Sequence, residues 1–204
     1  MTTTEQEPIV EKKQVVVFDI CSSSNMLEDL ILSQNEQAMR DLIISIKRHL
    51  KSESVNLGFE MYKFIGDGWI LLFPPNVEGK VLIRFLRELC HKFERSLNKY
   101  VLKHLQSTPQ VIGLTFGMDR GDLIRMRMMN TREYIGRPLN IASRLQGAIK
   151  EKDGNPAYKV LLSKSSFNAL GIDETKYKTK RVTRTLRNIQ GGRKYACVKL
   201  ILEI

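Results

Sequence analysis

The 204-residue sequence lacks the features that would place a protein in a membrane or outside the cell. No apolar run approaches the roughly 18 residues that a membrane span requires. Residues 1–13 are mostly polar and include acidic side chains, which is unlike a signal peptide, and we expect them to form a flexible tail. The three cysteines, Cys21, Cys90 and Cys197, show neither a disulfide framework nor a metal-ligand spacing. These absences favour a cytoplasmic protein.

Acidic residues are also fewer than basic ones: the sequence has 22 Asp and Glu and 33 Lys and Arg, which gives a net charge of +11. Such a charge favours an anionic partner, whether nucleic acid, a membrane surface or a polyphosphate. The basic residues concentrate in KYKTKRVTRTLR (176–187), although a solvated basic strand would have the same composition. A nucleic-acid-binding module would need aromatic residues among the basic ones, and this segment has only Tyr177, which argues against nucleic acid.

The sequence contains no repeat, low-complexity block or linker, so we predict one domain over residues 14–204. Apolar periodicity predicts, in chain order, a strand at 14–21, a helix at 27–50, strands at 55–65 and 69–73, a helix at 80–105, strands at 110–119 and 123–129, a helix at 137–150, a strand at 159–163, a helical turn at 164–170 and two terminal strands. This order indicates an α+β fold: a ferredoxin-like βαββαβ core with extra C-terminal strands and helices on one face of the sheet.

Two carboxylates follow neighbouring elements of this predicted core. Asp19 ends the first strand, and Asp67 lies at the tip of the hairpin YKFIGDGWILLF (62–73). If strand and hairpin pair, as in a split βαβ sheet, the two carboxylates meet at one edge, where a divalent cation would relieve their repulsion. Mg²⁺ favours one or two carboxylates together with phosphate oxygens and water. The alternative is an ordinary turn aspartate and an unrelated strand end.

Two further groups suit a phosphorylated ligand. Ser22, Ser23 and Ser24 precede a helix whose free backbone amides and positive dipole can face an anion, although an ordinary N-cap has the same sequence. Asn140 and Arg144 lie at i and i+4 on one helix face, from which they can position a sugar oxygen and neutralise a phosphoryl group. A solvated polar stripe is the alternative for this second pair.

These pieces together resemble the class III nucleotidyl cyclases, over about residues 14–200. The matching motifs are FDI (18–20), KFIGDG (63–68), FGMDRGDLI (116–124) and EYIGRPLNIASRL (133–145), in the order found in that family. A compact basic domain with DICSSSN and YKFIGDGW is most similar to the pyrimidine cyclases of the Pycsar anti-phage systems. The resemblance implies a cyclase homology domain that converts a nucleoside triphosphate to its 3′,5′-cyclic nucleotide with release of pyrophosphate.

The resemblance also implies roles for the matching residues. Asp19, Asp67 and the backbone carbonyl of Ile20 would hold two Mg²⁺ or Mn²⁺ ions. Asn140 would orient the ribose, and Arg144 would stabilise charge in the transition state. In this family the metal residues and the remaining site residues come from opposite subunits, so the resemblance implies a head-to-tail homodimer with two composite sites. A separate effector protein would sense the cyclic nucleotide.

The base is not decided by the residues themselves. Lys63 and Glu133 stand where adenylate cyclases have their base-reading Lys and Asp, and adenine, cytosine and uracil all satisfy one donor and one acceptor. Tyr62, Trp69 and the Met-rich strand 125–129 are candidates to fill the room that a purine needs. UTP, ahead of CTP, is expected from the resemblance to the anti-phage cyclases alone. The alternatives are an adenylate cyclase, a nucleic-acid-binding module and a degenerate cyclase that acts as a scaffold.

Three further features bear on substrate binding. Arg184 and Arg187, in the basic segment, are candidates to hold the triphosphate tail. Ser23 and Ser24 stand where relatives have a phenylalanine followed by Thr or Ser, so a covering aromatic side chain is missing. Glu133 is one methylene longer than the usual aspartate.

Overall fold

The computed structural model describes residues 7–152, 154–189 and 194–204. Its strands are β1 (Ile9–Ile20), β2 (Glu60–Phe64), β3 (Trp69–Phe73), β4 (Leu114–Met128), β5 (Thr131–Ile135), β6 (Lys159–Ser163), β7 (Thr179–Thr185) and β8 (Lys194–Ile201). Its helices are α1 (Ser23–Leu32), α2 (Glu36–Leu57), α3 (Gly79–Tyr100), α4 (Arg137–Lys152), α5 (Lys164–Leu170) and a 3₁₀ turn, η1 (Leu102–His104). Among the described residues, no helix combines the length and apolar character needed to cross a bilayer.

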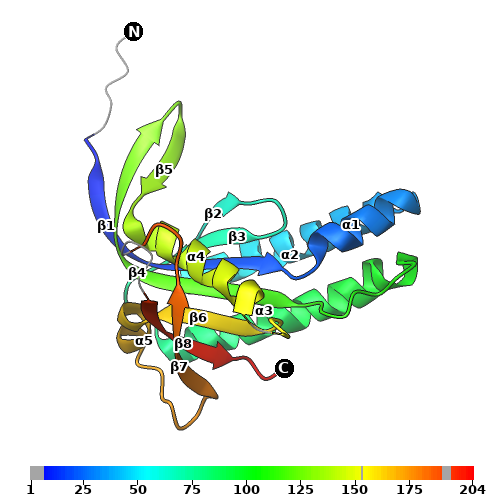
Figure 1. The fold of residues 1–204 in the computed structure, drawn as a ribbon. Helices are drawn as coiled ribbons and strands as arrows, with labels where there is room; N and C mark the ends of the chain where they lie inside the picture. Colours follow the sequence, from blue (N-terminus) through cyan, green and yellow to red (C-terminus); the bar gives the residue numbers. More distant parts are fainter. Residues whose placement is uncertain (1–6, 153, 190–193) are drawn as a thin grey trace.

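The strands form one sheet in the order β2-β3-β1-β4-β6-β8-β7, and β5 pairs with β4 outside this path (Figure 1). The first four strands have the ferredoxin-like order, in which β3 lies between β1 and β2 and every neighbouring pair is antiparallel. Strand β6 joins β4 in parallel, and β8 and β7 extend the sheet from there. The predicted α+β fold with a ferredoxin-like core and extra C-terminal strands is therefore confirmed.

Helices cover both faces of this sheet (Figure 1). On one face, Val16 and Phe18 of β1 belong to the main core cluster, which they share with α2 and α3. On the opposite face, Val15 and Val17 share a cluster with Ala142 of α4. Alternation along the strand explains the division, because successive side chains point to opposite faces. The prediction that the helices lie on one face is therefore wrong for α4, whose apolar stripe packs on the other side of the same strands.

Strands β1 and β4 are both longer than predicted, because the additional residues of one strand pair with those of the other. Strand β1 begins at Ile9, within the segment expected to be a flexible tail, whereas residues 1–6 lie outside the described residues. Lys12 and Lys13 of β1 pair with Asp122 and Gly121. The turn predicted at 120–122 is therefore absent, because these pairings keep β4 extended through it.

Three other boundaries differ from the prediction. The helix predicted at 27–50 is interrupted at 33–35, where Gln34 adopts a left-handed conformation with φ 57°. Helix α2 continues to Leu57 and ends at Gly58, so the strand predicted from residue 55 begins only at Glu60. Strand β5 was not predicted. It is the antiparallel partner of the distal part of β4, and the two form a projecting hairpin (Figure 1).

Candidate active site

A glycine brings the two candidate metal-binding carboxylates together. Phe18 of β1 pairs with Trp69 of β3, so the preceding Gly68 lies beside the end of β1. A Cβ atom at Gly68 would lie 1.9 Å from the Phe18 carbonyl oxygen and 3.0 Å from the Asp19 Cα. Only glycine permits this approach, which holds the turn that carries Asp67 against the end of β1 that carries Asp19. Both carboxylates are half-buried.

The serine-rich turn at residues 22–24 follows the same end of β1, and its three hydroxyls differ in their contacts. The Ser23 hydroxyl donates to Asp67 Oδ2, which ties the start of α1 to the hairpin tip. Ser22 caps α1 with a left-handed backbone (φ 59°), and its hydroxyl donates to the Val111 carbonyl at 2.8 Å, so it is engaged within the fold. Ser24 is exposed. Helix α1 therefore starts beside Asp67, and the first backbone amides of a helix can bind an anion.

The third metal ligand implied by the resemblance is a backbone group. Ile20 is the last residue of β1 and pairs with Leu114. Its side chain is completely buried in the main core, so its carbonyl is the only polar group that it can offer as a ligand.

Asp19 is contacted by two buried residues, which the sequence analysis did not identify. Gln146 of α4 donates from Nε2 to Thr115 Oγ1 at 2.8 Å and to Asp19 Oδ2 at 3.4 Å. Thr115 pairs with Asp19 across β1 and β4, and its hydroxyl lies 3.5 Å from the Asp19 carbonyl oxygen. No sequence signal could have found this contact, because it depends on how closely α4 approaches the sheet.

Asn140 and Arg144 lie on the same helix as Gln146 but project differently. Asn140 is exposed and Arg144 is half-buried, while Ile141 and Leu145 anchor α4 with fully buried side chains. Residues two apart on a helix do not share a face, so Arg144 does not point where Gln146 points. The buried Nε atom of Arg144 has no hydrogen-bond partner within the part of the chain that the structure describes. A buried guanidinium nitrogen of this kind can donate to an ordered water or to an acceptor on a ligand.

The structure brings Lys63 and Glu133 together as an ion pair, with 2.7 Å between Lys63 Nζ and Glu133 Oε2. A register shift between Met61 and Lys63 marks a β-bulge at Tyr62, and bulges commonly redirect side chains. The Tyr62 hydroxyl donates to the same Glu133 oxygen at 2.6 Å and accepts from the Tyr134 N–H at 3.0 Å. The hydrogen bonds from Lys63 and then Tyr62 lower the pKa of Glu133, so this carboxylate is charged at neutral pH.

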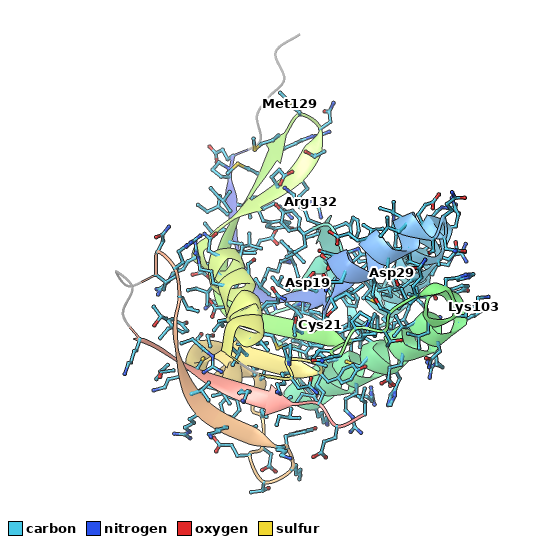
Figure 2. All side chains as sticks on the ribbon, turned by 45° about the vertical axis from the view of Figure 1, so that its right-hand side comes forward. Asp19, Cys21, Asp29, Lys103, Met129 and Arg132 are labelled. Carbon is cyan, nitrogen blue, oxygen red and sulfur yellow. The ribbon has the colours of Figure 1, made fainter. Side chains whose placement is uncertain are left out.

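A second set of contacts connects β2 to β5 beside this pair. The Tyr134 hydroxyl donates to Glu60 Oε2 at 2.9 Å, and Arg132 Nη1 lies 3.5 Å from the same oxygen. Burial, together with the Glu60 contact, raises the pKa of Tyr134 to about 12, so its hydroxyl remains a donor. Figure 2 shows Arg132 on the projecting hairpin, between the tip at Met129 and the body of the domain that contains Asp19.

Of the groups expected to limit room for the base, Tyr62 hydrogen-bonds to Glu133 and lies beside Lys63. Trp69 is 2% exposed and stacks on Phe18 with 5.4 Å between ring centroids, so it belongs to the core. The expectation for Trp69 is therefore wrong. In the Met-rich strand, Met126 pairs with Glu133, whereas Met128 and the following turn residue Met129 are exposed near the tip of the hairpin.

The two arginines that were expected to hold the triphosphate tail lie in and after β7, at the other edge of the sheet from β2. Arg184 is in β7, at the edge of the sheet opposite β2, and Arg187 follows that strand. Arg184 is half-buried and donates from Nη1 to the Thr183 carbonyl at 3.1 Å, while Arg187 is exposed. The structure does not bring either arginine to Lys63 within one chain.

Comparison with known proteins supports the fold and not a close relationship. The sequence matches no protein-family model and no curated protein. Solved structures of cyclases are nevertheless similar. The guanylyl cyclase Cya2 superposes with a TM-score of 0.70 at 13% identity, over 96% of this chain and 93% of that one. The adenylyl cyclase CyaB from P. aeruginosa gives 0.69 at 16% identity, over 96% and 97%.

A bacterial light-regulated adenylyl cyclase is similar to the same degree, with a TM-score of 0.69 at 16% identity. The match covers 95% of this chain and 52% of that protein, so the chain spans about half its length. The chain therefore has the fold of adenylyl and guanylyl cyclase catalytic domains. Because cyclases of both kinds are similar, the fold carries no preference for one base.

Proposed function

We propose that the protein is a metal-dependent nucleotide cyclase that converts a nucleoside triphosphate to its 3′,5′-cyclic nucleotide and pyrophosphate. One observation carries the proposal: the bare backbone of Gly68 packs on the Phe18 carbonyl and the Asp19 Cα, so the hairpin tip with Asp67 is held against the end of β1 that carries Asp19. Two carboxylates at the same end of neighbouring strands would repel each other, and a divalent cation between them would relieve that repulsion. A phosphate bound at the start of α1, which Ser23 links to Asp67, would supply further oxygen ligands for such a cation.

The groups at this edge fit Mg²⁺ or Mn²⁺. Asp19, Asp67 and the Ile20 carbonyl would supply hard oxygen ligands, and the Ser23 hydroxyl already provides a hydrogen to Asp67. No cluster of three or more His, Cys, Asp or Glu side chains occurs among the described residues, which suits a site completed by substrate phosphates and water. Two such ions would lower the pKa of the ribose 3′-hydroxyl and neutralise charge at the α-phosphate.

The remaining residues act on the substrate directly. In the reaction, the ribose 3′-oxygen attacks the α-phosphorus in line and pyrophosphate leaves. Asn140 orients the ribose, and Arg144 donates to phosphoryl oxygens as charge develops on them. The unsatisfied Arg144 Nε is consistent with a guanidinium that waits for such an acceptor. Nucleophile and phosphorus belong to one molecule, so the site acts mainly by positioning them.

We assign the complete site to a head-to-tail homodimer. Gln146 faces Asp19 of its own chain, whereas Arg144 projects away from it, so the metal half and the arginine half of one chain serve different sites. Phe64 and Ile65, in and after β2 on the hairpin that carries Asp67, are 52% and 41% exposed, and a partner subunit would cover these apolar side chains.

We assign pyrimidine substrates, UTP before CTP, to the Lys63–Glu133 pair. Tyr62 supports this assignment because its ring lies beside the pair and its hydroxyl occupies Glu133 Oε2, which reduces the space and the acceptors left for a base. Lys63 would then donate to uracil O4 and Glu133 would accept from N3–H. The cyclic nucleotide would act in anti-phage defence through a separate effector protein, as the resemblance implies.

The substrate assignment is tested by comparing kcat/KM for UTP, CTP, ATP and GTP under identical Mn²⁺, with the cyclic products identified by mass. We expect UTP to be preferred to ATP by about tenfold or more, because steric overlap with a larger base costs more than the roughly 1–3 kcal/mol of a missing contact. A preference for ATP would make Lys63 and Glu133 an ordinary adenine-reading pair and leave the cyclase assignment intact. No cyclic product from any triphosphate would overturn the proposed function.

Removal of the Tyr62 hydroxyl should weaken substrate selection without unfolding the protein. In Tyr62→Phe, Glu133 loses one of two donors and the Tyr134 amide loses its acceptor, at a cost of about 1 kcal/mol for each hydrogen bond. We expect kcat/KM for the preferred triphosphate to fall about fivefold to tenfold. The matched control is Tyr134→Phe, which removes a hydroxyl bonded to Glu60 and leaves the contacts of Glu133 intact. An equal loss in both variants would contradict a direct role for Tyr62.

A further inference from the structure

The approach of α4 to the sheet is set by a glycine in β4. A Cβ atom at Gly117 would lie 1.9 Å from the Ala142 carbonyl oxygen and 2.4 Å from the Gln146 amide nitrogen. Any side chain at this position would lift α4 away from β4. Because Gly117 has none, the middle of α4 rests on the backbone of the strand, and Gln146 is 9% exposed.

In this buried position the side-chain amide of Gln146 connects α4 to β4 and β1. It donates to the hydroxyl of Thr115, which is completely buried, and to the side chain of Asp19. The Thr115 hydroxyl in turn lies within 3.5 Å of the Asp19 backbone carbonyl. Asp19 is therefore contacted at both its side chain and its backbone by one connected pair of polar groups, which approach from α4 and β4.

We infer that Gln146, acting with Thr115, is a positioning residue that fixes the orientation of the Asp19 carboxylate for metal binding. A hydrogen bond to Oδ2 restricts rotation of the carboxylate. Polar groups that orient a metal ligand commonly change metal affinity or activity by 10–100-fold when they are removed. The inference rests on the proposed function, because it assigns a role toward the metal that Asp19 would hold.

The contact also connects the two halves of the chain. Helix α4 carries Asn140 and Arg144 as well as Gln146, so the position of the substrate-binding face depends on the same contact of α4 with β4 that orients Asp19. In a head-to-tail dimer these two faces belong to different composite sites. The Gln146 amide is thus a direct polar connection between the metal half of one site and the arginine half of the other.

The test removes the donor and keeps the volume. Gln146→Met preserves length and helix propensity but cannot hydrogen-bond to Asp19 or Thr115. We expect the Mn²⁺ concentration for half-maximal activity to rise about tenfold, with a smaller change in KM for the nucleotide at saturating Mn²⁺. Mn²⁺ binding in the presence of a 3′-deoxynucleoside triphosphate, which cannot be cyclised, should weaken in parallel; it is followed by the electron paramagnetic resonance signal of the free ion and corrected for the Mn²⁺ that the nucleotide binds alone. Asp19→Ala provides the baseline for loss of the ligand itself.

The matched control is Gln14→Met. Gln14 is 1% exposed and its amide donates to the Val15 and Asp119 carbonyls, so the variant removes a buried amide elsewhere on β1. It should lower stability without changing the Mn²⁺ dependence. If Gln146→Met does not fold, Thr115→Val carries the same test, and Thr115→Ser should restore wild-type Mn²⁺ dependence because it keeps the hydroxyl.

The outcomes separate this inference from the proposed function. If wild-type protein binds Mn²⁺ through Asp19 but Gln146→Met and Thr115→Val bind it equally well, the positioning role is overturned and the metal site stands. If Gln14→Met shifts the Mn²⁺ dependence as much as Gln146→Met does, the effect is one of general stability and the positioning role is again overturned. If wild-type protein and Asp19→Ala bind Mn²⁺ alike, both the inference and the metal site of the proposed function fall.

Discussion

Asp67→Ala is expected to reduce cyclisation by about a thousandfold or more, because bound metal supplies several kcal/mol of transition-state stabilisation. Asp67 lies in the turn between β2 and β3, where its side chain accepts one hydrogen bond from Ser23. Its removal should therefore leave the fold intact, with a change in Tm of about 5 °C or less. Asp19→Ala should have an equally large effect on activity. Product formation from UTP and Mn²⁺, measured together with thermal unfolding, separates the two effects.

Two controls identify what the loss means. Asp67→Asn keeps the size of the side chain and its ability to support a turn but removes the charge, so it should be nearly as inactive as Asp67→Ala. Asp41→Ala removes a carboxylate from the exposed side of α2, where its ion pair with Arg40 spans 3.7 Å, and should retain full activity. Substantial turnover by Asp67→Ala would show that this aspartate only forms the turn between β2 and β3.

The ferredoxin-like core could be predicted because its strands and long helices have strong periodicity. Two of the errors, at the start of β1 and in the middle of β4, occurred where polar residues pair across the sheet. IVEKK (9–13) reads as part of a polar tail, and Arg120-Gly121-Asp122 reads as a turn, but in the fold each segment supplies the hydrogen-bonding partners of the other. Local sequence cannot reveal such a pairing, because the partners are more than one hundred residues apart.

The candidate site likewise contains residues that could be predicted from the sequence and a residue that could not. The positions of Asp19 at a strand end and Asp67 at a hairpin tip could be predicted from local patterns, whereas Lys63 and Glu133 were associated only through the family resemblance. The position of Trp69 could also have been read from the strand, since its cross-strand partner Phe18 alternates with residues of the other face. Gln146 could not be predicted. Its contact with Asp19 exists only because α4 rests on the bare backbone of Gly117.

Mixing two inactive variants is expected to restore activity if the site is shared between subunits. Asp67→Ala damages only the metal half of a chain, and Arg144→Ala damages only the half that contacts the phosphates. In a mixed head-to-tail dimer, one composite site receives both damaged halves and the other receives neither. If chains pair at random, half of the dimers are mixed and each has one intact site, so about a quarter of wild-type activity is the ceiling.

The control for this experiment uses two variants that damage the same half. Asp67→Ala mixed with Asp19→Ala should stay inactive, because each composite site takes its metal ligands from one chain and every chain is then defective. Subunit exchange is verified by isolating dimers with two different affinity tags before the assay. Recovery in the first mixture and none in the second would be specific to a composite site. No recovery in either, after exchange has been verified, would mean that Asp67 and Arg144 of the same chain act together, even though Arg144 projects away from the face of α4 that contacts Asp19.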